Sequence, residues 1–437
     1  MYRRSDCCRT DQHVHNLFQD ELYFLNRYLR HGIIRNLFYY IFNMKIACVI
    51  LGTRGDVQPM IALSTGLIKN GHEVIICAPP ENEELAMRYD CQFVAFGPGI
   101  KKKLKENPQK QKGGVAVKIT PKEGKKFTGD QINLLPGIIK GVDLVLGAGI
   151  VPGVQTAADI LKVPYRYVAF YPVILGTTKD DPFIDRMMFG FGRTMMNMLM
   201  KGFINKNRAR FGLPPIRDIW KHWMGENVII ACDKELNAAR DGSAFPFTQT
   251  GFMLLPSKIT LPGNVGDFLN AGEPPVYIGF GSNPISGPEK YSQMFPQVRD
   301  ATGQRLIISK GWADLPENNS RDILYVDEVP FELLFPRLAA VVYHGGTGTM
   351  AAIARAGIPQ AAFPFMADQF ANRKQIVKLG LGPGTCDFKK MTAEAISSAI
   401  TECVTNDIYK KNSVEMSQRL QNVNGIDLTV QHLVLGR

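Results

Sequence analysis

The sequence predicts an α/β protein in which two Rossmann-like domains, each a doubly wound parallel sheet, face each other across a cleft. Three observations predict this fold class. The strand-like segments are continuous apolar runs, as in parallel strands that are covered on both faces. They alternate with helix-like segments, first from residue 44 and again from residue 273. At 437 residues, the chain also exceeds what one hydrophobic core usually organises.

The first domain is expected over residues 44–255. "KIACVI" is its first strand, and "HEVIICAP", "DLVLGAG" and "YRYVAF" are later strands. The segment "PMIALSTGLIKNG" has apolar residues at helical spacing, with Pro59 near its start and Gly71 just past its end. This alternation of strand and helix is typical of a doubly wound fold.

The second domain is expected over residues 273–437. Prolines and glycines replace the periodicity at residues 256–272, which predicts a linker. The alternation then restarts with "VYIGF", "RLIIS", "ILYVD" and "AAVVY", and the last helix is a candidate to cross back to the first domain. Ligands of such folds bind at the carboxyl ends of the strands, which face the cleft.

Three segments depart from this pattern. Residues 1–43 are interpreted as an N-terminal extension, because Met44 opens a complete first strand. Residues 101–126 carry ten lysines against two glutamates, a composition that predicts a mobile surface loop. Residues 180–225 are predicted to be irregular and are rich in methionine, which either fills a core or lines a pocket for an irregular apolar ligand.

Composition and charge indicate which classes of partner, and which cellular compartment, to expect. A formal charge of +11 favours nucleotide phosphates and acidic lipid headgroups, and no nucleic-acid module accompanies it, so we expect no nucleic-acid partner. Eight cysteines without the spacing of a disulfide framework indicate a cytoplasmic protein. No apolar stretch approaches the roughly 18 residues of a spanning helix. The lysines of 101–126 and the N-terminal segment predict a loose peripheral contact with the anionic inner face of a membrane.

The strongest local signal is the turn "HGGTGT" at residues 344–349. It follows an apolar strand and leads directly into a helix. Unpaired backbone N–H groups at the start of that helix favour an anion, and His344, Thr347 and Thr349 add side-chain donors beside glycines that allow close approach. A strand-to-helix turn with capping threonines is the structural alternative. We interpret the turn as a phosphate-binding site.

Two further segments add polar groups near the same edge. "GFGS" ends the first strand of the second domain, where Ser282 can donate to a diphosphate. Asp368 and Gln369 stand at a loop-to-helix junction. Asp368 fits an N-cap there. The pair can also hold vicinal hydroxyls, because Asp accepts hydrogen bonds while Gln both donates and accepts them.

These motifs together carry a family resemblance. "GTRGDVQP", "GFGS", "SKGWADL", "FPRLAAVVYHGGTGT" and "AGIPQAAFPFMADQ" occur in the order and spacing of the GT-B-fold nucleotide-sugar glycosyltransferases of the UDP-glycosyltransferase superfamily. The chain looks most similar to sterol and lipid glucosyltransferases and to the bacterial enzymes that glycosylate glycopeptide or macrolide aglycones. It reads "DQFAN" where many sterol-type relatives continue "DQPFW", a departure that bears on the acceptor side.

The resemblance implies roles for residues on both sides of the cleft. In the second domain, the diphosphate would be bound by the turn with Ser282, the uracil by the backbone at Val329, and the sugar hydroxyls by Asp368 and Gln369. The residues implied at the nucleotide are Ser282, Trp312, Val329, His344, Gly346, Thr347, Gly348 and Thr349. In the first domain, Gly52, Thr53, Arg54 and Gly55 would shape the loop around Asp56, which matches the general base of the family.

Asp56 is the candidate catalytic residue. A carboxylate at the carboxyl edge of the first sheet can accept a proton from the acceptor hydroxyl while that oxygen attacks the anomeric carbon. Attack opposite the departing nucleotide inverts the anomeric configuration, and His344 and the helix start face the charge on the leaving diphosphate. The alternative is that Asp56 caps the following helix or pairs with Arg54. No Asp-x-Asp occurs in the chain, so we expect neither a metal nor another cofactor.

The sequence therefore predicts a hexosyltransferase that moves a sugar, with glucose the first choice, from a UDP-sugar to a hydroxyl of a lipophilic acceptor. A sterol, a lipid and a polyketide-like aglycone all fit. The alternative is a catalytically silent nucleotide-sugar-binding protein or membrane scaffold of the same fold. A dehydrogenase is disfavoured, because the first strand is not followed by G-x-G-x-x-G and an acidic ribose ligand.

Overall fold

A computed structural model describes residues 43–99, 120–179, 181–281, 288–311, 315–365 and 367–435 of the chain. Ser282 and Trp312 lie outside these residues, as do nearly all of the N-terminal extension and most of the lysine-rich segment. The membrane contact predicted for those two segments is therefore not addressed by the structure. Within the described ranges, no helix is long and apolar enough to cross a membrane.

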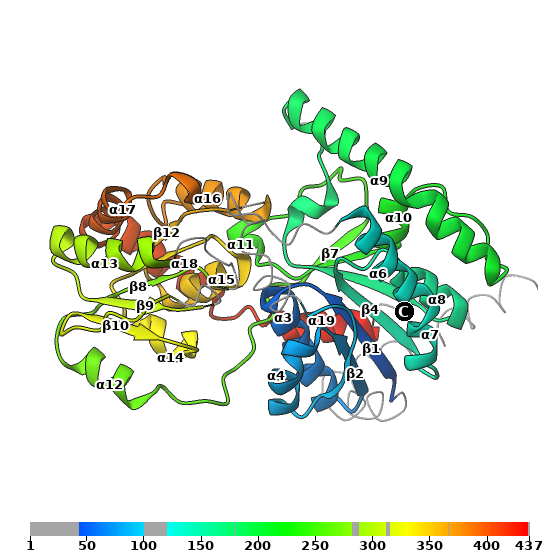
Figure 1. Cartoon of the computed structure of the whole chain (residues 1–437), viewed down its shortest axis with the longest axis horizontal. Helices are drawn as coiled ribbons and strands as arrows, with labels where there is room; N and C mark the ends of the chain where they lie inside the picture. The colour runs from blue at the N-terminus through cyan, green and yellow to red at the C-terminus, as the bar shows by residue number, and fades with distance from the viewer. Residues whose placement is uncertain are drawn as a thin grey trace, which may run out of the picture.

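The predicted fold class is confirmed, because the chain forms two parallel sheets in two domains (Figure 1). The first sheet has the strand order β3-β2-β1-β4-β5-β6-β7. Its strands are β1 (Lys45–Leu51), β2 (Glu73–Ala78), β3 (Gln92–Ala95), β4 (Leu144–Gly149), β5 (Tyr165–Ala169), β6 (Val228–Ile230) and β7 (Phe247–Gln249).

The second sheet has the strand order β10-β9-β8-β11-β12. Its strands are β8 (Val276–Gly279), β9 (Leu306–Ser309), β10 (Ile323–Val326), β11 (Ala340–Tyr343) and β12 (Gln360–Ala362). Every neighbouring pair in both sheets is parallel. The carboxyl ends of neighbouring strands therefore lie along one edge of each sheet, where the turns that carry the candidate residues emerge.

Helices cover both sheets and connect their strands. In the first domain they are α3 (Arg54–Lys69), α4 (Glu83–Arg88), α6 (Pro121–Asn133), α7 (Leu135–Ile138), α8 (Val154–Leu161), α9 (Phe183–Arg210), α10 (Ile219–Met224) and α11 (Lys234–Asn237), with 3-10 turns η1 (Pro80–Asn82) and η3 (Pro172–Leu175). From the linker onward they are α12 (Gly263–Asn270), α13 (Pro288–Thr302), α14 (Phe331–Leu334), α15 (Thr347–Ala356), α16 (Ala367–Lys378), α17 (Ala393–Thr405), α18 (Asp407–Leu420) and α19 (Gly425–Leu435), with η4 (Phe335–Arg337) and η5 (Phe388–Lys390).

The first helix begins earlier than the sequence pattern indicates. The apolar periodicity predicts a start near Pro59, but α3 begins at Arg54 and contains Pro59. The reason is a capping arrangement in which Thr53 is the N-cap and Asp56, three residues later, accepts from the Thr53 backbone N–H. Asp56 therefore belongs to the first turn of a helix rather than to an open glycine loop.

The methionine-rich segment is regular, contrary to prediction. Most of residues 180–225 forms α9, a helix of 28 residues, followed by α10. Proline is absent from the interior of α9, and its leucine, methionine, lysine and arginine residues are good helix formers. Residues 256–272, predicted as a linker, also contain the short helix α12, in which Val265 and Leu269 are buried.

Buried contacts away from the linker help to join the two domains. The last helix, α19, packs on α3, where Gly66 allows close approach: a Cβ there would lie 2.3 Å from Cγ2 of Ile426. The Arg355 guanidinium of α15 forms two hydrogen bonds to Asp233 in the first domain, of 2.7 and 2.9 Å. The Asp233 side chain is fully buried, and it also accepts from the Phe252 backbone N–H.

We expect Arg355→Met to lower the free energy of unfolding by about 3 kcal/mol, because it leaves the buried Asp233 carboxylate without its charged partner. Urea denaturation measures the change. The control is Lys411→Ala, which breaks the exposed Lys411–Glu415 pair on α18 and should cost less than about 0.5 kcal/mol. Equal effects of the two substitutions would contradict the structural importance of the buried pair.

Candidate functional site

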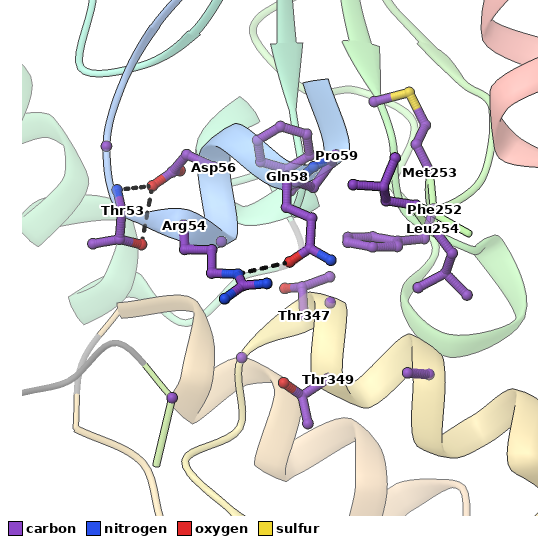
Figure 2. Close-up of a pocket in the computed structure, with 18 of the residues that line it drawn as sticks. Thr53, Arg54, Asp56, Gln58, Pro59, Phe252, Met253, Leu254, Thr347 and Thr349 are labelled. Carbon is purple, nitrogen blue, oxygen red and sulfur yellow. Dashed lines mark hydrogen bonds between the residues drawn. The ribbon is translucent and has the colours of Figure 1, made fainter. Parts of the chain in front are cut away.

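The candidate residues line one cavity of about 880 Å³ between the domains. Every predicted site residue within the described ranges contributes to its wall. From the first domain these are Gly52, Thr53, Arg54, Gly55 and Asp56, and from the second they are Val329, His344, Gly346, Thr347, Gly348, Thr349, Asp368 and Gln369. Figure 2 shows the start of α3 opposite Thr347 and Thr349 of α15 across this space.

Asp56 is held by the turn that begins α3. Its Oδ2 accepts from the Thr53 backbone N–H at 2.8 Å and from Thr53 Oγ1 at 3.4 Å (Figure 2). Gly52 has no side chain to interfere, since a Cβ there would lie 2.1 Å from Asp56 Oδ2. The carboxylate therefore caps its helix and lines the cavity at the same time, so the capping alternative and a role in the cavity are compatible.

The surroundings make Asp56 a stronger base than an exposed aspartate. Burial raises its pKa from 3.8 to about 6, and the hydrogen bonds from Thr53 oppose that shift only in part. A carboxyl group with this pKa is mostly ionised at pH 7 and close enough to neutrality to accept a proton efficiently. This tuning favours general-base chemistry.

Arg54 points away from Asp56. Its Nε donates to Gln58 at 3.3 Å, and its Nη2 pairs with Glu328, which follows β10 in the second domain. The guanidinium of Arg54 lowers the pKa of Glu328, and Arg88 contributes from 3.7 Å. The hydrogen bonds of Asp56 to described residues go to Thr53, so the alternative in which Asp56 pairs with Arg54 is not what the structure contains.

The turn between β11 and α15 presents backbone donors to the cavity. Gly345 has a φ of +88°, a conformation that favours glycine, and Gly346 is the N-cap of α15 without a side chain to occupy the first N–H groups. The buried Asn372 braces this turn by donating to the Gly345 carbonyl at 2.9 Å and to Thr347 Oγ1 at 3.0 Å. A helix N-terminus held in this way has the geometry that favours an anion.

His344 is neutral at pH 7. Burial lowers the pKa of its imidazole from 6.5 to about 4, with the Gly279 carbonyl opposing the shift. Its ring packs tightly against two glycines: a Cβ on Gly346 would lie 2.4 Å from Nε2, and one on Gly281 would lie 2.9 Å from Cε1. The neutral imidazole has a single N–H and brings no positive charge of its own to the cavity.

Asp368 and Gln369 lie at the start of α16. Asp368 Oδ2 accepts from Thr347 Oγ1 at 3.4 Å, and the carboxylate also accepts from the backbone N–H groups of Asp368 and Gln369. Because α16 begins at Ala367, Asp368 lies within its first turn and is not the predicted N-cap. Gln369 Oε1 accepts from the Phe365 backbone N–H at 2.8 Å. Burial raises the pKa of Asp368 to about 6, and the negative charge of Asp56 adds to the shift, so the two carboxylates influence each other across the cavity.

The sequence interpretation missed Tyr171 and Glu328. Tyr171 lines the cavity just after β5, and burial raises the pKa of its phenol, with added effects from Asp368 and Asp56. Its position beyond a strand at the same sheet edge was the available signal. Glu328 precedes Val329 in "DEVP". Its pairing with Arg54 depends on how the two domains are placed, and a local sequence pattern cannot predict that.

The first domain supplies an apolar wall to the cavity. The side chains include Phe127, Ile150, Tyr167, Phe170, Ile174 and Trp223. The methionines of residues 180–225 are absent from the described lining, and Trp223 is the one residue of that range that contributes. Of the two alternatives for residues 180–225, the structure does not place the described methionines in this pocket; the range contributes Trp223, and the apolar wall is largely aromatic.

The amino-acid sequence matches two known families. Residues 46–128 match the glycosyltransferase family 28 N-terminal domain, and residues 308–423 match the erythromycin biosynthesis protein CIII-like, C-terminal domain. A vancomycin aglycone glucosyltransferase of Amycolatopsis orientalis is 30% identical over 390 residues, which cover 84% of this chain and 92% of that protein. Sterol 3-beta-glucosyltransferase UGT80A2 of Arabidopsis thaliana is 27% identical, over 89% of this chain and 64% of that protein.

Solved structures share the fold. The glycosyltransferase VinC in complex with DTDP superposes with a TM-score of 0.64 at 15% identity, covering 90% of this chain and 100% of that one. CalG4, the calicheamicin glycosyltransferase, gives 0.65 at 14% identity, covering 91% and 99%. At these identities the likeness concerns the two-domain architecture.

We expect Gly346→Ala to weaken binding of a nucleoside diphosphate such as UDP by at least about tenfold, because the new Cβ would displace the His344 ring from the α15 turn. Isothermal titration calorimetry measures the affinity. Gly55→Ala is the control, since its Cβ would meet only Thr53 Oγ1 at 3.6 Å. Unchanged UDP affinity in a folded Gly346→Ala protein would show that this turn is not the anion site.

Proposed function

Because the chain belongs to the GT-B glycosyltransferases, in the group of family 28 and EryCIII-like enzymes, we propose that it transfers a hexose from a UDP-sugar to a hydroxyl of a lipophilic acceptor, with inversion and without a metal. One observation carries this proposal: the Asp56 carboxylate and the anion-binding turn of α15 open onto the same cavity from opposite domains.

The second domain is the proposed donor site. The diphosphate lies at the start of α15, where backbone N–H groups, the Thr347 and Thr349 hydroxyls and a neutral His344 donate hydrogen bonds to it. The uracil contacts the backbone near Val329. Asp368 and Gln369 accept from and donate to the sugar hydroxyls, in keeping with their position beside Thr347. Ser282 and Trp312, outside the described residues, complete the donor site in this proposal.

The reaction is a single displacement. The acceptor O–H proton passes to Asp56 while the oxygen forms a bond to the anomeric carbon, and the bond from that carbon to the diphosphate oxygen breaks. The negative charge that develops on the diphosphate is stabilised by the donors of the α15 turn. Attack and departure occur on opposite faces of the sugar, so the configuration at the anomeric carbon inverts.

The acceptor is proposed to be lipophilic, because the first-domain wall of the cavity is largely aromatic and aliphatic. Sterols, other lipids and polyketide-like aglycones fit this chemistry. The relatives do not decide between them, because some are named for an aglycone and others for a sterol. The segment "DQFAN" favours testing the aglycones as seriously as the sterols. Relatives include a dTDP-epi-vancosaminyltransferase, so dTDP-sugars are tested beside UDP-glucose.

We expect Asp56→Asn to reduce transfer at least about 100-fold while UDP affinity stays within about twofold of wild type, because the amide cannot accept the acceptor proton. UDP or dTDP release is measured with a panel of sterols and polyketide aglycones. Asp90→Asn, on the exposed rim of the first domain, is the control substitution. Transfer by Asp56→Asn at the wild-type rate would remove Asp56 from the mechanism, and nucleotide binding without release for any acceptor would favour the silent binding protein.

We expect kcat/KM to fall about tenfold per pH unit below about pH 6, because protonation of Asp56, whose pKa is about 6, removes the base. Asp368 titrates in the same range, so the acidic fall in the pH profile reports Asp56 and Asp368 as a coupled pair. Initial rates between pH 4.5 and 8, with each sample re-assayed at pH 7 to exclude denaturation, provide the profile. A fall in kcat/KM that begins only near pH 4, the ordinary pKa range of aspartate, would contradict the role of Asp56 as the base.

A further inference from the structure

One large apolar surface of the molecule is not part of the cavity. Helix α9 projects along the edge of the first domain (Figure 1), and eight of its large hydrophobic side chains are exposed. We call them the apolar stripe of α9: Phe183, Ile184, Met187, Met188, Phe191, Met195, Met198 and Leu199. Phe183 is 77% exposed and Met198 is 74% exposed, so the apolar stripe includes side chains that stand mostly in solvent.

The stripe occupies the side of α9 that faces away from the protein. At about 100° per residue, its members span one half of the helix, centred opposite the buried residues Met200, Ile204 and Asn207. The usual arrangement in a surface helix is the reverse, with the polar side outward. A stripe about 25 Å long that keeps large apolar groups outward indicates an interaction surface.

The charges of α9 favour an anionic partner. Asp185 is its only acidic residue. Lys201 and Lys206 are exposed on the same side of the helix as the stripe, directly after it, and Arg210 lies at the border of that side. Among the described residues, neither lysine has an ion-pair partner. With a chain charge of +11, contact with a second copy through this surface would oppose like charges.

We propose that α9 is an interfacial helix that lies in the plane of an anionic lipid surface, with the apolar stripe at the boundary of headgroups and acyl chains and Lys201 and Lys206 among the lipid phosphates. An outward apolar side with flanking cations and a length of 28 residues is what such helices need. This contact resides in α9 and is distinct from the lysine-rich segment.

Helix α9 is connected to the cavity through aromatic packing. The inward-facing Phe189 of α9 makes an edge-to-face contact with Trp220, with ring centroids 5.6 Å apart. Trp220 Nε1 donates to the carbonyl of Ile174 at 3.3 Å, and Ile174 lines the cavity. If the proposed transferase function holds, a protein seated on α9 brings the apolar wall of its acceptor site close to the bilayer that dissolves a lipophilic acceptor.

The test is co-sedimentation of the full chain with vesicles, without donor or acceptor. Wild type is expected to bind vesicles of phosphatidylcholine mixed with phosphatidylglycerol, and to bind phosphatidylcholine alone more weakly. Met188→Glu/Met198→Glu should lower the partition coefficient at least about tenfold, because it places two carboxylates in the apolar stripe. Lys201→Gln/Lys206→Gln should weaken binding to the anionic vesicles and reduce its salt dependence.

The matched control is Ile408→Glu/Val414→Glu on α18, which introduces the same charges at exposed large hydrophobic residues of the other domain. It should leave vesicle binding unchanged. Equal vesicle binding by wild type and Met188→Glu/Met198→Glu would overturn the proposal. So would light scattering that shows a wild-type dimer and a monomer for this variant alone, because the apolar stripe would then be a dimer interface. Sugar transfer to a water-soluble acceptor, measured separately, should be the same for all of these variants, so a failure here is distinguishable from a failure of the proposed function.

Discussion

The burial of two carboxylates in one cavity is the constraint on which the proposed chemistry depends. Asp56 comes from the first turn of α3 and Asp368 from the first turn of α16, and loss of water raises both pKa values to about 6. Asp56 accepts hydrogen bonds from Thr53, and Asp368 accepts them from Thr347 and from the backbone of its own turn. Among the described residues, neither carboxylate forms an ion pair. A sugar held between them would replace the missing water with hydroxyl groups, from which a carboxylate accepts hydrogen bonds.

The one arginine in the described second-domain wall of the cavity, Arg355, is already paired with Asp233. His344 is neutral and Arg54 is engaged with Glu328, so the groups ready to meet a diphosphate are mainly the backbone N–H groups of α15 and the threonine hydroxyls. Donors of this kind are fixed in direction by the helix and need little rearrangement when charge develops. Their precision depends in turn on Asn372, which ties the turn to α16, and on Arg355, which ties α15 to the first domain.

Much of this organisation could be predicted from local sequence. The strands were recognisable as apolar runs, and the turns around Asp56 and His344 stood at the carboxyl ends of β1 and β11, so parallel pairing was enough to bring them to the cleft. The start of α3 was placed too late because apolar periodicity outweighed the Thr53–Asp56 cap. The pairing of Arg54 with Glu328, 274 residues apart, could not be predicted, because it depends on the relative placement of two domains. Helix α9 was missed because its methionines lie on both its exposed and its buried sides, which blurs the apolar periodicity, and because Gly190, Gly192 and Gly202 interrupt the segment.

Helix α19 places the end of the described chain on the domain where the chain's fold begins. Its Ile426 packs over Gly66 of α3, and Thr429 Oγ1 hydrogen-bonds Thr250 Oγ1 at 2.8 Å in a buried position. During synthesis, the surface of α3 that α19 covers therefore stays exposed until the whole second sheet has left the ribosome. The first domain is therefore completed by α19, which follows the second domain in the sequence. A fragment that ends between the two sheets would lack this covering helix.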